Sequence, residues 1–165
     1  MALLDAIMAR RSVRKYEAKA VPEQTLENIL EAGRCAPSAD NKQPWHFIVV
    51  TDPKIKEKLS KRKWSGFIRD SAFTLVGCAY RGDACSRKWS TIDTAIALEN
   101  MVIAAWSLGV ASCWVGDFEE AEVKRMLHVP KEWRIVSLIS FGYPDETPSR
   151  TPRKSLREIA SDNRF

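Results

Sequence analysis

The sequence contains no long hydrophobic segment and few cysteines. No apolar run approaches the roughly 18 to 20 residues that a transmembrane helix needs, so we expect no membrane-spanning segment. The four cysteines form no CxxC pair and have no metal-ligand spacing with His46 or His128, which argues against a zinc site. Reduced thiols in a cytoplasmic protein are therefore expected.

Common nucleotide-binding motifs are absent as well. Neither GxGxxG nor GxxxxGK[ST] occurs, which argues against a Rossmann dinucleotide site and a P-loop. There is no internal repeat, low-complexity stretch or Gly/Ser linker, so the 165 residues predict one domain, 1–165. The opening MALLDAIMARR places apolar residues before the arginines, the reverse of a secretory signal, and predicts a first helix.

The positive charge is spread along the chain. The formal net charge is +5, but Lys and Arg do not gather on one segment as they do in many nucleic-acid-binding proteins. Two short basic clusters, residues 10–15 and 150–154, stand near opposite ends of the sequence. They fit one phosphate group better than a polyanion, so we expect no nucleic-acid partner. A basic nucleic-acid binder, with an affinity that falls steeply with salt, remains the alternative.

Helical and strand patterns alternate along the chain, which predicts an α/β or α+β protein. Helices are expected over residues 2–10, 22–35, 53–61, 91–108, 119–127 and 156–159. Strands are expected over residues 46–51, 72–80, 111–115 and 134–141.

The expected helix at 91–108 is apolar on almost all sides, with Gly109 as a plausible C-cap. Such a helix must be buried nearly all round, and a small domain can achieve this by sharing it with a second subunit. Asp93 and Glu99 interrupt the apolar pattern. Because buried charges need partners, we expect these two side chains to form ion pairs across a dimer or to lie at its rim.

Two segments carry residues suited to binding an anionic, planar cofactor. The segment RRSVRKY, residues 10–16, offers arginine forks and a serine hydroxyl that match phosphate oxygens. The segment APSADNKQPWHF, residues 36–47, is a stiff polar loop that could aim amide groups at a planar ring. Taken singly, the first is equally a solvated helix end and the second an ordinary connection.

Taken together, these segments resemble the N-terminal half of the nitroreductase family. Residues 94–118, TAIALENMVIAAWSLGVASCWVGDF, resemble its central helix and following strand, and residues 152–156 resemble its basic C-terminal segment. The resemblance covers nearly the whole chain in the right order. It implies an α+β fold with a four- or five-stranded, mostly antiparallel sheet flanked by helices. It also implies an intertwined homodimer with FMN at the interface.

The resemblance also implies which residues hold the cofactor. Arg10, Arg11 and Ser12 match the positions that contact the FMN phosphate and ribityl chain, and Arg153, with Lys154, matches a closing phosphate contact. Arg14 matches a basic position beside the pyrimidine edge of the flavin, where a cation stabilises the reduced form. The remaining matches are Pro37, Ser38 and Asn41, which reach the flavin from the other subunit, and Trp114, Val115 and Gly116, which pack against the ring.

Two features depart from the family pattern. The acid that family members often carry near Gly116 is displaced by one place, to Asp117, which leaves its role open. Only about ten residues, 81–90, link the expected strand and central helix, where larger members carry extra helices. Trp89 in this link is either a lid over the site or a surface aromatic at the dimer rim.

The implied activity is hydride transfer from NAD(P)H through flavin N5 to a small acceptor such as a nitroaromatic or a quinone. The flavin carries the chemistry, and no catalytic acid or base is assigned. The alternatives are a flavin-binding storage or regulatory protein without NAD(P)H turnover, and a member with other flavin chemistry, such as dehalogenation or dehydrogenation.

Overall fold

A computed structural model describes residues 2–165. The fold is α+β, and its elements agree closely with the sequence patterns outside the central helix. The helices are α1 (Leu3–Ala9), α2 (Glu23–Arg34), α3 (Pro53–Leu59), α4 (Ala84–Ser107), α5 (Glu120–Met126) and α6 (Leu156–Ile159), with short 3₁₀ turns η1 (Ala39–Asn41) and η2 (Gly66–Ile68). The strands are β1 (Trp45–Val50), β2 (Phe73–Tyr80), β3 (Ala111–Val115) and β4 (Trp133–Gly142). None of these helices is long and apolar enough to cross a membrane.

The four strands form one sheet in the order β1-β2-β4-β3, and every neighbouring pair is antiparallel. Long β2 and β4 occupy the centre, and both are almost entirely buried. A register shift between Gly77 and Cys78 marks a bulge in β2. The expected mostly antiparallel sheet is therefore confirmed. Strand β3 forms one edge of this sheet, and two of its residues line the candidate site described below.

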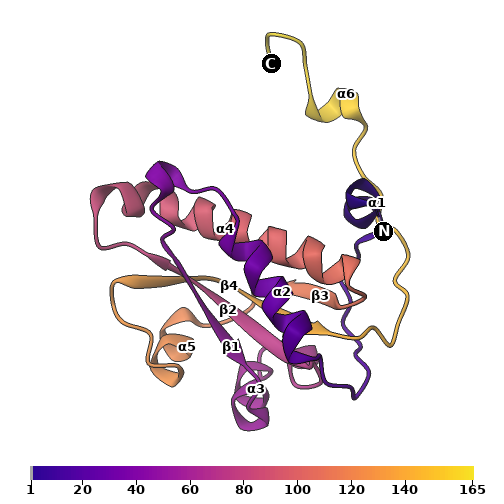
Figure 1. The fold of residues 1–165 in the computed structure, drawn as a ribbon, viewed down its shortest axis with the longest axis vertical. Coiled ribbons are helices and arrows are strands. Elements are labelled where there is room, and N and C mark those ends of the chain that lie inside the picture. Colours follow the sequence, from indigo (N-terminus) through magenta and orange to yellow (C-terminus); the bar gives the residue numbers. More distant parts are fainter. Residues whose placement is uncertain (1) are drawn as a thin grey trace.

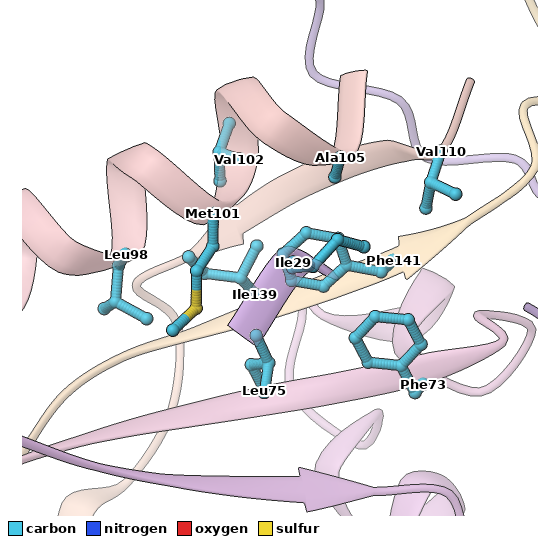
Figure 2. Close-up of a cluster of buried hydrophobic side chains, with 10 residues drawn as sticks. All are labelled: Ile29, Phe73, Leu75, Leu98, Met101, Val102, Ala105, Val110, Ile139 and Phe141. Carbon is cyan, nitrogen blue, oxygen red and sulfur yellow. The ribbon is translucent and has the colours of Figure 1, made fainter. Parts of the chain in front are cut away.

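Helices cover both faces of the sheet (Figure 1). On one face, α2 and α4 pack over a core that includes Ile29, Met101 and the stacked rings of Phe73 and Phe141, as Figure 2 shows. On the other face, α3 and α5 cover a second apolar cluster that contains Leu59 and other aliphatic side chains. Successive strand side chains alternate between the two cores, as the period of an extended chain requires.

The central helix begins earlier than the sequence pattern predicted. It starts at Ala84 instead of residue 91, because the Asp83 carboxylate caps it by accepting hydrogen bonds from the amide and hydroxyl of Ser86, at 3.0 and 2.7 Å. These bonds also lower the pKa of Asp83. The expected ten-residue link is therefore only residues 81–83, and Trp89 lies within α4. The predicted stop is confirmed, since Gly109 has a φ of 79° just beyond the helix.

One face of α4 lacks a covering element. The face toward α2 and the sheet is buried, but Ile92 and Ile96 remain 52% and 38% exposed within the single chain. The apolar side chains of α1 are exposed as well, and α1 contacts α4. The C-terminal segment runs past α1 and ends with α6 well away from the sheet (Figure 1). These exposed apolar surfaces are the ones that a second subunit would have to cover.

Candidate functional site

The two basic clusters that stand apart in the sequence meet in one cavity. A pocket of about 350 Å³ opens between the end of α1 and residues 148–153 of the C-terminal segment. Its lining includes five guanidinium groups and no carboxylate. These are Arg10, Arg11, Arg14, Arg150 and Arg153. A pocket with this charge is suited to an anion, above all to phosphate oxygens that accept paired N–H donors.

Local backbone contacts hold the first basic segment in place. The guanidinium of Arg11 donates to the carbonyls of Met8, Ala9 and Arg10 at 3.0, 2.8 and 2.9 Å, so it caps the end of α1. The next residues then run beside the sheet edge, where the amide of Val13 donates to the Ser112 carbonyl of β3 at 3.1 Å. Arg11 therefore shapes the turn, whereas the guanidinium groups of Arg10 and Arg14 make no hydrogen bond to the backbone of residues 2–165.

Glu99 on α4 connects the basic pocket to β3. Its carboxylate lies 3.8 Å from Nε of Arg10 and accepts a hydrogen bond of 3.0 Å from Nε1 of Trp114. Asp93, six residues earlier on α4, is buried and accepts from the amide of Ala39 at 3.3 Å. The tertiary fold thus supplies partners for both acids within the chain, and the Glu99 side chain stays 44% exposed. Their expected pairing across a dimer, or position at its rim, stays a prediction.

A second pocket, of about 630 Å³, adjoins the first and has a different character. Aromatic and small residues dominate its lining, including Trp64, Phe67 and Gly116. Arg14 lines both pockets, and its guanidinium lies 5.9 Å from the centre of the Phe67 ring. Its backbone amide donates to Glu146 at 2.6 Å, which fixes the chain between the two cavities. We call these cavities the basic pocket and the ring pocket.

The predicted site residues divide among these cavities. Arg10, Arg11, Ser12, Arg14 and Arg153 line the basic pocket. Arg14 is also in the ring pocket, together with the predicted Trp114, Val115 and Gly116. Lys154, Pro37, Ser38 and Asn41 line neither cavity.

The loop around η1 lies at the other end of α4 from the basic pocket (Figure 1). Asp40, Asn41 and Gln43 all have φ near 50°, and the Ser38 hydroxyl accepts a hydrogen bond of 2.9 Å from the Gln43 amide. In its own chain this loop lines neither pocket. Its predicted contact with the flavin of the other subunit remains a prediction.

Sequence reasoning missed the segment between α3 and η2, residues 60–65, which forms a wall of the ring pocket. Asp117 holds this segment: its carboxylate accepts from the backbone amide of Trp64 at 2.8 Å and lies 3.4 Å from Nε of Arg62. The displaced acid therefore positions a loop. The one available signal was an aromatic residue among basic ones between two expected elements.

Cys113 lies on β3 beside the basic segment. It is buried, and burial raises the pKa of its thiol, so the thiol stays protonated at neutral pH. Cys113 therefore fits a small apolar side chain packed in the core better than a reactive thiol.

Comparison with known proteins places this geometry in a family. The model of the Nitroreductase family matches residues 7–72 and 60–143. A protein of Methanothermobacter thermautotrophicus, provisionally named NADH dehydrogenase/NAD(P)H nitroreductase, is 33% identical over 90% of this chain and 80% of its own length. The NADPH-flavin oxidoreductase of Vibrio harveyi is 24% identical over 98% of this chain and 74% of its own.

Among solved structures, a nitroreductase family protein from Clostridium novyi is 32% identical. It superposes with a TM-score of 0.82 over 92% of this chain and 89% of the other.

Proposed function

This chain belongs to the nitroreductase family, and we propose from that premise that it is an FMN-dependent oxidoreductase passing a hydride from NAD(P)H to a small acceptor such as a nitroaromatic or a quinone. The observation that carries the proposal is the junction of the two pockets, since the lining of one is suited to an anion, the lining of the other is suited to a flat ring, and Arg14 lines both. The names of the relatives support the same chemistry.

The residues present fit FMN, which has one terminal phosphate and one planar ring system. A pocket lining with five guanidinium groups and no carboxylate suits the phosphate, although Glu99 lies 3.8 Å from Nε of Arg10 and the Arg11 guanidinium is bonded to the end of α1. In the ring pocket, a side-chain carbon built on Gly116 would meet nothing within 4 Å, so this backbone faces open space. We assign Arg10, Ser12 and Arg153 to the phosphate end and Arg14 to the ring end.

When bound, FMN supplies the group that accepts a hydride and passes it on. The protein contributes position and electrostatics. The Arg14 cation stabilises negative charge at the ring end and so favours reduction. Asp117, the one carboxylate in the lining of the ring pocket, is engaged by Trp64 and Arg62, so it holds the wall of the pocket.

A second subunit completes the site in this proposal. The exposed Ile92 and Ile96 on α4 call for an apolar partner surface. Because Pro37, Ser38 and Asn41 line neither pocket of their own chain, their predicted role requires that they reach the ring pocket of the partner. An isologous homodimer, in which each subunit lends this loop to the other, satisfies both requirements.

The test begins with the colour of the purified protein. We expect the two visible absorption bands of oxidised flavin, release of FMN and not FAD on acid treatment, and steady NAD(P)H oxidation when menadione or a nitrofuran is present. Bound FMN without NAD(P)H oxidation would instead identify a storage or regulatory flavoprotein. A colourless protein that takes up no flavin on reconstitution would overturn the cofactor assignment.

A further inference from the structure

The wall of the ring pocket between α3 and η2 presents an unusually exposed aromatic side chain. Trp64 lines the ring pocket and is 69% exposed, compared with 39% for Trp89 on α4. An indole held in water at the mouth of a pocket offers a flat apolar face that a planar ligand can cover. Phe67, which also lines the pocket, supplies a second ring.

The backbone beneath this indole is held firmly. The carboxylate of Asp117 accepts from the Trp64 amide at 2.8 Å. The hydroxyl of Ser65 is fully buried, accepts from the Arg62 amide at 3.2 Å and donates to the Leu59 carbonyl at 3.0 Å. The loop is thus ordered before a ligand arrives, which lowers the entropic cost of binding.

Positive charge accompanies both rings. The ammonium of Lys63 lies 4.9 Å from the centre of the Trp64 ring, and the guanidinium of Arg14 lies 5.9 Å from that of Phe67. Within residues 2–165, no carboxylate lies within 4.0 Å of the Lys63 ammonium. The acid in the lining, Asp117, already has Arg62 beside it at 3.4 Å. The mouth of the pocket therefore carries an uncompensated cation beside a flat apolar surface.

We propose that Trp64 and Lys63 form the acceptor subsite, and that it selects planar aromatic acceptors that carry a carboxylate or another negative charge. The indole stacks on the aromatic ring of the acceptor, and the ammonium meets its anionic substituent. Arg14, which reaches both pockets, serves the cofactor, so the two cations have separate tasks. This inference rests on the proposed function, because it names the substrate class for the same ring pocket.

The test measures binding without turnover. We titrate the flavin-loaded protein, without NAD(P)H, with 4-nitrobenzoate and with its neutral methyl ester, and determine both Kd values by calorimetry at low ionic strength. We expect the anion to bind at least about threefold more tightly, as for one exposed charge pair, and added salt to reduce the preference. Lys63→Gln should abolish the preference and Lys63→Arg should keep it. Trp64→Ala should weaken both ligands, by about two- to tenfold.

Lys58→Gln is the matched control, because Lys58 is an exposed lysine on α3 that lines neither pocket. It should leave both Kd values unchanged. Equal affinity for anion and ester in the wild type, or a preference that survives Lys63→Gln, would overturn the subsite.

A kinetic arm separates this outcome from failure of the proposed function. Photoreduced protein is mixed with each acceptor, and flavin reoxidation is followed. If the anion binds more tightly than the ester but neither acceptor reoxidises the flavin, the proposed oxidoreductase function is refuted and the binding subsite is retained. If the protein oxidises NAD(P)H with menadione but binds anion and ester equally, the subsite is refuted and the oxidoreductase function is retained.

Discussion

Arg10 and Arg14 are only four residues apart in the sequence, but their side chains lie in different environments. Arg10 lines only the basic pocket and lies 3.8 Å from Glu99, whereas Arg14 also enters the ring pocket. A phosphate binds best to the paired N–H donors of a guanidinium group, whereas negative charge on a reduced ring is stabilised by any nearby cation. The two side chains should therefore affect different properties of the bound flavin.

We expect Arg10→Ala and Arg153→Ala each to weaken FMN binding by roughly 1.5 to 3 kcal/mol, the usual loss for a charge-assisted contact. Arg14→Ala should lose less FMN but lower the flavin reduction potential and slow hydride acceptance. Arg14→Lys should restore much of the potential, whereas Arg10→Lys should restore less of the affinity.

Titration of apo-protein with FMN and measurement of the potential of each loaded variant test these expectations. The assignment of Arg14 to the ring end is refuted if Arg14→Ala loses FMN as severely as Arg10→Ala while its remaining flavin keeps the wild-type potential.

A buried thiol on β2 should make stability depend on alkaline pH. Burial raises the pKa of Cys78 to about 11, from an ordinary value of 9.0. Between these values the unfolded chain releases the proton more readily than the folded one, so the free energy of unfolding should fall as pH rises from 9 to 11. Denaturant unfolding of wild type and Cys78→Ala over this range measures the effect. The variant should show a shallower fall, and Cys35→Ala, at an exposed cysteine, should match the wild type.

At the scale of elements, α2 and α4 pack closely against each other. Gly33 on α2 faces Met101 on α4, and a side-chain carbon at Gly33 would overlap the Met101 thioether. Glycine is normally unfavourable inside a helix by about 1 kcal/mol relative to alanine, so its presence reflects this contact. On the sheet side, a carbon added to Gly77 of β2 would come within 2.6 Å of Leu98.

Gly33→Ala should therefore lower the free energy of unfolding. Overpacking costs about 1 to 3 kcal/mol, and the higher helix propensity of alanine offsets about 1 kcal/mol of this, so the expected net loss is about 1 kcal/mol. In a Met101→Ala background the same change should become neutral or stabilising, because the added methyl fills vacated space. A double-mutant cycle by denaturant unfolding gives the coupling. Additive effects would show that the two helices do not meet at this point.

At the scale of the whole molecule, α4 organises both the core and the proposed dimer. One side of it packs on the sheet, while Ile92 and Ile96 are exposed on the other. We expect the wild type to have about twice the 18.7 kDa chain mass in solution. Ile96→Glu should give a monomer, because an unpaired charge is costly in an apolar interface, and FMN should be lost with the partner loop.

Light scattering combined with the visible absorption spectrum measures mass and flavin content together. Lys58→Glu is the control, since it places a new carboxylate on α3, on the opposite side of the sheet from α4. This variant should stay dimeric and yellow. A stable monomeric Ile96→Glu protein that retains FMN would contradict a shared site.

The sequence by itself determined the local elements and the basic end of the site. The strand patterns, the stop at Gly109 and the segment at residues 10–16 depend on neighbours close along the chain, so periodicity and motif spacing reveal them. The early start of α4 escaped this reasoning because residues 84–90 mix polar and apolar side chains without a continuous apolar stripe. A capping carboxylate at Asp83 decides where the helix begins.

Only the tertiary structure decided how distant segments combine. The sheet order β1-β2-β4-β3 places β3 at an edge beside residues 12–13. The C-terminal arginines then meet Arg10 across more than a hundred residues, and Asp117 holds the loop that carries Trp64. Such contacts produce no periodic pattern or motif in the sequence, because they form only when the helices and strands pack together. The basic clusters therefore indicated a phosphate, whereas the aromatic wall and its lysine emerged only from the fold.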